Sequence, residues 1–158
     1  MQEIINRLRA KKGDEGFTLI ELLVVVVIIG VLVAIAVPVY LNYREGAADK
    51  SAQSDVRGAI SAVEQYYTNN GNAYPGDVAA TTGTGGKIVL PATGTGGTAG
   101  TITISDGTTL QLKNNSTYYV ICANNSGGTK NKYYQYNSQN GGSVKASAAT
   151  TMAACIAG

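Results

Sequence analysis

The sequence predicts an α+β protein, in which one long N-terminal helix packs on a small antiparallel sheet. A helical pattern without a stop signal runs from about Phe17 to about Thr68. After it the composition turns to Gly, Thr, Asn and Ser, with short β-rich runs between turn residues. The 158 residues leave room for one small domain beyond the helix.

The first half of the predicted helix is apolar enough to cross a membrane. Leu22 to Leu41 are twenty uncharged residues, which as a helix span about 30 Å, the thickness of a hydrocarbon core. Lipid forces the backbone to satisfy its own hydrogen bonds, so this segment is helical despite its many β-branched residues. Residues 1–16 carry four Lys and Arg residues, and such flanks stay on the cytoplasmic side.

Two residues weaken this apolar helix. Pro38 removes a backbone donor and Gly30 is a poor helix former, so a kink or local opening is expected near residues 34–38. Gly46 is a possible break, which leaves open the alternative of a membrane span followed by a separate helix.

The second half of the helix is amphipathic, and a core-facing stripe lies opposite a water-facing one. The expected core stripe is Ala48, Ala52, Val56, Ile60, Val63 and Tyr67; the expected water-facing side is Asp49, Lys50, Gln53, Arg57 and Glu64. A Gly/Thr-rich loop is expected over residues 69–100. Short antiparallel strands are expected at Lys87–Leu90, Thr101–Ile104, Leu110–Leu112, Thr117–Ala123 and Lys132–Tyr136. A three- or four-stranded sheet is expected to lie on the amphipathic half of the helix.

Composition argues against an enzyme or a nucleic-acid-binding protein. The chain contains no histidine, which removes the common catalytic triads and the commonest metal ligand, and after residue 70 its only carboxylates are Asp77 and Asp106. A net charge of +2 implies no polyanionic partner. We therefore expect no catalytic site, metal or cofactor. Cys122 and Cys155 are expected to form a disulfide if the domain is exported, with a reduced buried pair as the alternative.

The segment Gly16 to Leu23 reads GFTLIELL and follows the basic leader directly. With Pro38 further on, it resembles the type IV pilin family, including the pseudopilins of type II secretion, over about residues 13–43. The resemblance implies that a prepilin peptidase cuts between Gly16 and Phe17 and methylates the new Phe17 amine. It divides the chain into a leader (1–16), a transmembrane or filament-core helix half (17–43) and a globular head (44–158).

Glu21 is the residue that the apolar segment alone does not explain. A lone carboxylate in lipid costs about 2.5 kcal/mol or more. The cationic amine that cleavage creates at Phe17, on the same or a neighbouring subunit, can supply the counter-charge during assembly. The local alternative is that Glu21 is simply an acid at a helix N-terminus, favoured by the helix dipole.

The resemblance implies a structural, non-enzymatic subunit that waits in the membrane as a single-pass protein and then polymerises into a cell-surface filament for adhesion, motility or DNA uptake. Its implied partners are copies of itself, the prepilin peptidase, the membrane assembly machinery and the lipid bilayer. In pilins a pair such as Cys122 and Cys155 encloses a surface region. The alternatives are a pseudopilin of a secretion or competence system and a membrane-tethered adhesion or binding domain.

Two further short motifs offer competing interpretations. Ala34-Ile35-Ala36 fits the A-x-A rule of ordinary signal peptidase, and a cut there would release a soluble protein that begins at Val37. Leu90 to Gly94 reads LPATG, which resembles a sortase sorting signal. A sorting signal is followed by an apolar span and a basic tail, and neither follows here, so we interpret LPATG as part of a Thr/Gly-rich loop.

Overall fold

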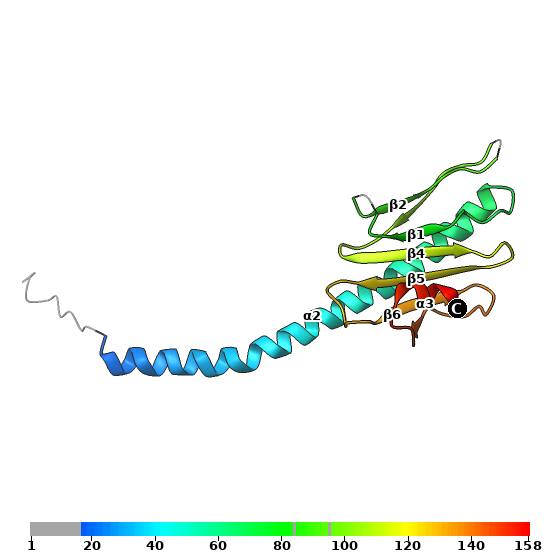
Figure 1. Cartoon of the computed structure of the whole chain (residues 1–158). Coiled ribbons are helices and arrows are strands. Elements are labelled where there is room, and N and C mark those ends of the chain that lie inside the picture. The colour runs from blue at the N-terminus through cyan, green and yellow to red at the C-terminus, as the bar shows by residue number, and fades with distance from the viewer. Residues whose placement is uncertain (1–16, 84, 95) are drawn as a thin grey trace, which may run out of the picture. The chain divides into compact units, whose positions relative to one another are not determined.

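A computed structural model describes residues 17–83, 85–94 and 96–158 (Figure 1). The chain divides into two compact units between Tyr40 and Leu41. Helix α2 (Leu19–Asn69) contributes to both of them.

In the first unit every described residue of the helix is exposed. Every large apolar side chain between Phe17 and Tyr40 is at least 47% exposed. By length and composition α2 is the one described helix able to cross a membrane, near the N-terminus. Because exposed apolar surface on this scale is unfavourable in water, the segment requires lipid or other chains around it.

Helix α2 is continuous over its 51 residues, with Pro38 inside it. Gly46 is also helical, so the alternative of a span followed by a separate helix is not observed. The kink predicted at Gly30 and Pro38 stays a prediction.

The second unit contains two antiparallel sheets among its described residues. The larger has five strands in the order β1-β4-β5-β6-β7, and the smaller pairs β2 with β3. The strands are β1 (Val78–Thr81), β2 (Lys87–Leu90), β3 (Gly100–Thr103), β4 (Thr108–Asn114), β5 (Tyr119–Asn125), β6 (Tyr133–Asn137) and β7 (Lys145–Ser147). A short helix, α3 (Met152–Ala157), follows the last strand.

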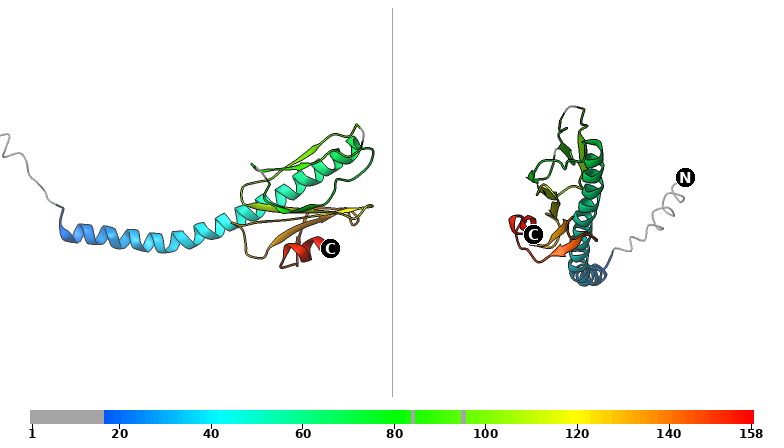
Figure 2. Two further views of the ribbon diagram at one scale, coloured as in Figure 1. Left: turned by 45° about the horizontal axis from the view of Figure 1, so that its top comes forward. Right: turned by 90° about the vertical axis from the view of Figure 1, so that its right-hand side faces the viewer.

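The main core lies between the C-terminal half of α2 and one face of the five-stranded sheet. Leu110 and Leu112 of β4 lie beside Ala123 and Ile121 of β5 in the strand register, and all four are completely buried. Because side chains alternate along a strand, Val120 and Cys122 face the other way, where α3 covers the sheet (Figure 2). The sheet is thus covered by a helix on each face.

The main sheet has more strands than predicted. β1 and β7 bring it to five strands rather than three or four, and both are only three or four residues long. The predicted loop 69–100 also contains β1 and β2. β1 and β7 carry too few alternating residues to be recognised without their neighbours, whereas β2 is the expected run Lys87–Leu90.

The structure corrects the predicted faces of α2 at three positions. Asp49, expected in water, is buried with 4% of its surface exposed, and Asp55 is also buried. Tyr66 rather than Tyr67 reaches full burial in the core. The partners that allow two carboxylates to be buried lie in loops fifty or more residues away.

Candidate assembly site

Thr18 and Glu21 cap the N-terminal end of α2 reciprocally. The backbone N–H of Thr18 donates to Glu21 Oε2 at 2.8 Å, and the Thr18 hydroxyl donates to the same oxygen at 2.6 Å. In return the Glu21 N–H points at Thr18 Oγ1 at 3.3 Å. This is a capping box, in which two otherwise unpaired helix-end donors are satisfied.

Phe17 lies directly before this cap, with 79% of its surface exposed. Gly16, on the other side of the predicted cleavage bond, lies outside the described residues. Phe17, Ile20, Val24 and Val25 surround Glu21 with an apolar hollow of about 380 Å³. Glu21 is the only charged residue from 17 to 43.

The cap shows how the chain can keep an acid at this position before any cleavage. The carboxylate is satisfied by Thr18, and the positive end of the helix dipole also favours it. This agrees with the local interpretation of Glu21. It leaves the pairing with a Phe17 amine as a prediction, since that amine does not exist in the uncut chain.

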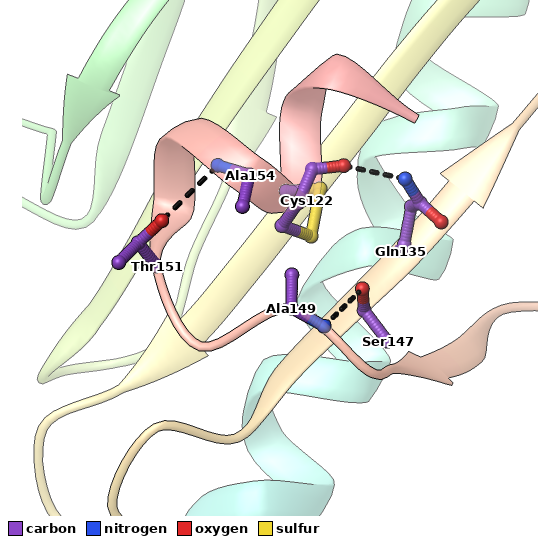
Figure 3. The surroundings of a disulfide bond; sticks show 7 residues. Cys122, Gln135, Ser147, Ala149, Thr151 and Ala154 are labelled. Carbon is purple, nitrogen blue, oxygen red and sulfur yellow. Dashed lines mark hydrogen bonds between the residues drawn. A yellow bond between two sulfur atoms is a disulfide. The ribbon is translucent and has the colours of Figure 1, made fainter.

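A disulfide joins Cys122 of β5 to Cys155 of α3, thirty-three residues apart (Figure 3). Both sulfur-bearing residues are completely buried, in a small apolar cluster on the outer face of the sheet. The structure thus contains the pairing expected for an exported domain. It attaches the C-terminal segment to the centre of the sheet.

The segment before and within α3 is also held by hydrogen bonds (Figure 3). The Gln135 amide donates to the Cys155 carbonyl, and Thr151 caps α3 by accepting from the Ala154 N–H at 3.2 Å. The Ala149 N–H donates to Ser147 Oγ. The disulfide and these hydrogen bonds together hold the C-terminal segment against the sheet.

Asp49 fastens the loop between β5 and β6 to α2. Its carboxylate accepts from the Thr129 N–H at 3.0 Å, from the Thr129 hydroxyl at 2.8 Å and from Lys132 Nζ at 2.8 Å. Burial opposes ionisation of Asp49, but the Lys132 ammonium and the two Thr129 donors outweigh it, so the pKa of Asp49 is lowered. The hydrogen bond to Asp49 correspondingly raises the pKa of Lys132.

Asp55, two turns further along α2, fastens the turn between β3 and β4. It accepts from the Ser105 N–H at 2.9 Å and from the Ser105 hydroxyl at 3.0 Å. Sequence reasoning missed both carboxylates because their partners are 50 to 83 residues away in the chain. A weak signal existed, since Asp49 and Asp55 sit next to the apolar stripe of the helix.

The C-terminal part of α2 contacts β5 and the segment after β2 through hydrogen bonds that involve tyrosines. The completely buried Tyr119 donates its hydroxyl to Glu64 at 2.6 Å, and burial together with this carboxylate raises the pKa of Tyr119 strongly. Tyr66 donates to the Pro91 carbonyl at 2.7 Å. Within LPATG, Leu90 is completely buried. This burial and the hydrogen bond to Pro91 attach the segment to the head.

Possible metal ligands were compared over residues 17–83, 85–94 and 96–158. No group of three or more acidic or cysteine side chains is placed there to hold an ion.

The comparisons with known proteins agree with the N-terminal motif. A family model described as the prokaryotic N-terminal methylation motif matches residues 11–37. The chain is 36% identical over 105 residues to the type IV major pilin protein PilE1 of Neisseria gonorrhoeae. The aligned residues cover 64% of this chain and 49% of that protein. It is 41% identical over 80 residues to a fimbrial protein of Neisseria meningitidis, covering 48% of this chain and 47% of that protein.

A secretion protein is also among the relatives. The chain is 38% identical over 65 residues to the type II secretion system core protein G of Aeromonas hydrophila, covering 41% of this chain and 45% of that protein. The chain thus spans about half the length of the curated relatives it matches. No solved structure matches it. These matches confirm the predicted resemblance to type IV pilins.

Proposed function

We propose that this chain, which carries the methylation motif and resembles type IV pilins, is a structural subunit of a type IV pilus. One observation carries the proposal: an exposed apolar helix carries a capped acid in its first turn, at the matched motif. The same apolar surface is suited to lipid before assembly and to a bundle of identical helices afterwards. No catalytic step is proposed.

Processing is proposed to occur between Gly16 and Phe17. It leaves a cationic amine four residues before Glu21. When the helices leave the membrane and bundle, Glu21 would be buried, and an unpaired buried charge is costly. The amine of a neighbouring subunit compensates it and sets the stagger between adjacent helices. The proposed partners are therefore copies of the chain, the prepilin peptidase, the assembly machinery and, before assembly, the bilayer.

The head is proposed to lie on the outside of the filament, at the cell surface. Its disulfide agrees with folding in an oxidising compartment. Its C-terminal region, bounded by Cys122 and Cys155, is proposed as the surface open to other partners.

A pseudopilin is the second candidate, favoured by the similarity to the type II secretion core protein. Such a subunit would be built alike and would form a short piston across the envelope. Filaments outside the cell support the pilus, whereas their absence in cells that secrete by this system supports the pseudopilus.

The proposal is tested by mass spectrometry of the mature N-terminus together with electron microscopy of sheared cell-surface material. We expect a chain that begins with N-methylated Phe17 and filaments that contain it. A mature chain that begins at Val37, or an uncut Gly16–Phe17 bond, would overturn the proposal. The first result would indicate ordinary signal peptidase and the second a tethered binding domain.

A further inference from the structure

A groove of about 570 Å³ lies between α2 and two turns of the head. Its helix side contains Leu41, Glu45 and Ala48, which share one helix face because they are three or four residues apart. The opposite side consists of residues 106–107, between β3 and β4, and residues 125–127, at the end of β5. We call this the helix groove.

The shape of the helix groove is fixed by the two buried carboxylates. Asp55 holds Ser105, next to the first turn, and Asp49 holds Thr129, close to the second. Both contacts involve a backbone N–H as well as a hydroxyl. The groove is therefore preformed, and binding there needs little ordering of loops.

The charges of the helix groove are only partly compensated by the residues that the structure describes. The carboxylates of Glu45 and Asp106 form no ion pair with any residue that the structure describes. Arg44 also lines the groove, but it is engaged in a contact of its own. Leu41 adds an aliphatic surface that is 51% exposed. This combination suits a partner that presents an aliphatic side chain beside a cation.

The two-stranded sheet presents such a pair. Along β2, Ile88 and Leu90 are buried, so Lys87 and Val89 point outward. Val89 is 63% exposed and is the only exposed large apolar side chain among the described residues after Tyr43. Across the register its neighbour is Thr101 on β3. We call Lys87, Val89 and the adjacent threonines the β2–β3 outer face.

We propose that the β2–β3 outer face of one subunit docks into the helix groove of another copy of this chain. Val89 would cover the groove side of Leu41, which is the last residue of the apolar run, and Lys87 would approach Glu45 and Asp106. Because the two surfaces lie on different elements, the contact is heterologous and leaves one groove and one outer face free to continue. The inference rests on the proposed function and specifies which surfaces of neighbouring heads meet.

Two other exposed lysines of the head fit the groove less well. Lys130 and Lys145 are exposed, but no exposed large apolar side chain accompanies them. An exposed ion pair alone contributes about 0–1 kcal/mol. Even with Val89 the contact is small, so we expect it to form where the packed helices already raise the local concentration of heads.

Cysteine cross-linking of the full-length protein tests the contact. The native cysteines are joined to each other, so the thiols of a Leu41→Cys/Val89→Cys variant are the only free ones. We expect oxidised filaments of this variant to give a ladder of covalent multimers on denaturing gels. Either single variant should stay monomeric on the same gels. The double variant Val89→Cys/Ser61→Cys should also stay monomeric, because Ser61 lies on an exposed part of α2 outside the groove.

Charge reversal tests the electrostatic part in the same cysteine background. Adding Lys87→Glu should lower the multimer yield severalfold, and adding Glu45→Lys to that variant should restore it. Filaments that form without the ladder, or a ladder equally strong with Ser61→Cys, would overturn the docking contact while the pilus function stands. Wild-type protein that forms no filaments would overturn the proposed function itself.

Discussion

Glu21 Oε2 accepts two hydrogen bonds from Thr18, one from the backbone N–H and one from the hydroxyl. The acid that starts the apolar helix therefore has a local partner within the uncut chain. This relationship separates two roles of Glu21, since a capping box needs an acceptor at this position but does not need a charge. Substitutions can distinguish the two.

We predict that Glu21→Gln leaves a capped, membrane-inserted and processed subunit that assembles poorly. Glutamine can replace glutamate in a capping box, but it cannot neutralise a buried amine, and breaking a buried charge pair costs about 3–5 kcal/mol. Filament yield, measured on sheared material, should fall by at least about tenfold. The control is Thr18→Ala, which removes the capping hydroxyl and should cost only about 0.5–2 kcal/mol of helix stability.

Wild-type filament yield from Glu21→Gln would assign Glu21 to the cap alone. In that case Glu21→Val, which removes both the acceptor and the charge, should resemble Thr18→Ala. If the charge matters, Glu21→Val should instead resemble Glu21→Gln, with a processed N-terminus in both variants.

The disulfide should contribute a large share of the stability of the head. In the chain-entropy model, linking residues thirty-three positions apart stabilises by roughly 3 to 4 kcal/mol. We predict this loss for Cys122→Ala/Cys155→Ala, measured by urea unfolding. Gln135→Leu, which removes only the hydrogen bond to the Cys155 carbonyl, should cost about 0.5–1.5 kcal/mol. Equal losses in the two variants would contradict the dominant role of the disulfide.

The stability of the head should fall in acid because of Asp49. Its pKa is lowered in the folded state, so its contribution is complete above the unfolded value of about 3.9 and is lost as the pH falls through the folded value. The pKa of Lys132 is raised. Its contribution is therefore present below about pH 10.4 and lost as the pH rises through the folded value.

Urea midpoints at a series of pH values check this dependence. Asp49→Asn should destabilise the head by about 1–3 kcal/mol at neutral pH and flatten the acid limb of the curve. Asp77→Asn is the matched control, because Asp77 pairs with Lys113 but its side chain is 51% exposed, and exposed pairs contribute about 0–1 kcal/mol. An unchanged acid limb in Asp49→Asn would refute the assignment.

Two glycines should respond to alanine in opposite ways. Gly58 lies inside α2 with open space around an added Cβ, so Gly58→Ala should stabilise by about 0.5–1 kcal/mol. At Gly97 an added Cβ would overlap the Thr93 carbonyl and Asn70 Oδ1, and Asn70 is a buried residue that also donates to Thr98. Gly97→Ala should therefore destabilise by about 1–3 kcal/mol; a stabilised variant would show that this loop relaxes freely.

Much of the fold could be predicted from local pattern. The helix bounds, expected at about Phe17 to Thr68, are Leu19 to Asn69, and the run Lys87–Leu90 is strand β2. The missing pieces are β1, β7 and α3, which are short enough that only their neighbours make them regular. Local pattern also placed Asp49 in water, because the polarity of the residues along a helix does not show which distant residues will contact it.

By itself the sequence determined the apolar helix, the acid at its start and the motif that resembles the pilin leader, because periodicity and spacing along one segment carry these signals. Only the tertiary structure decided which carboxylates are buried, which side chain of β2 is exposed and where the helix groove lies. The buried carboxylates and the groove depend on contacts between residues fifty or more positions apart, such as those of Thr129 and Lys132 with Asp49. A buried charge is tolerated only where such partners arrive.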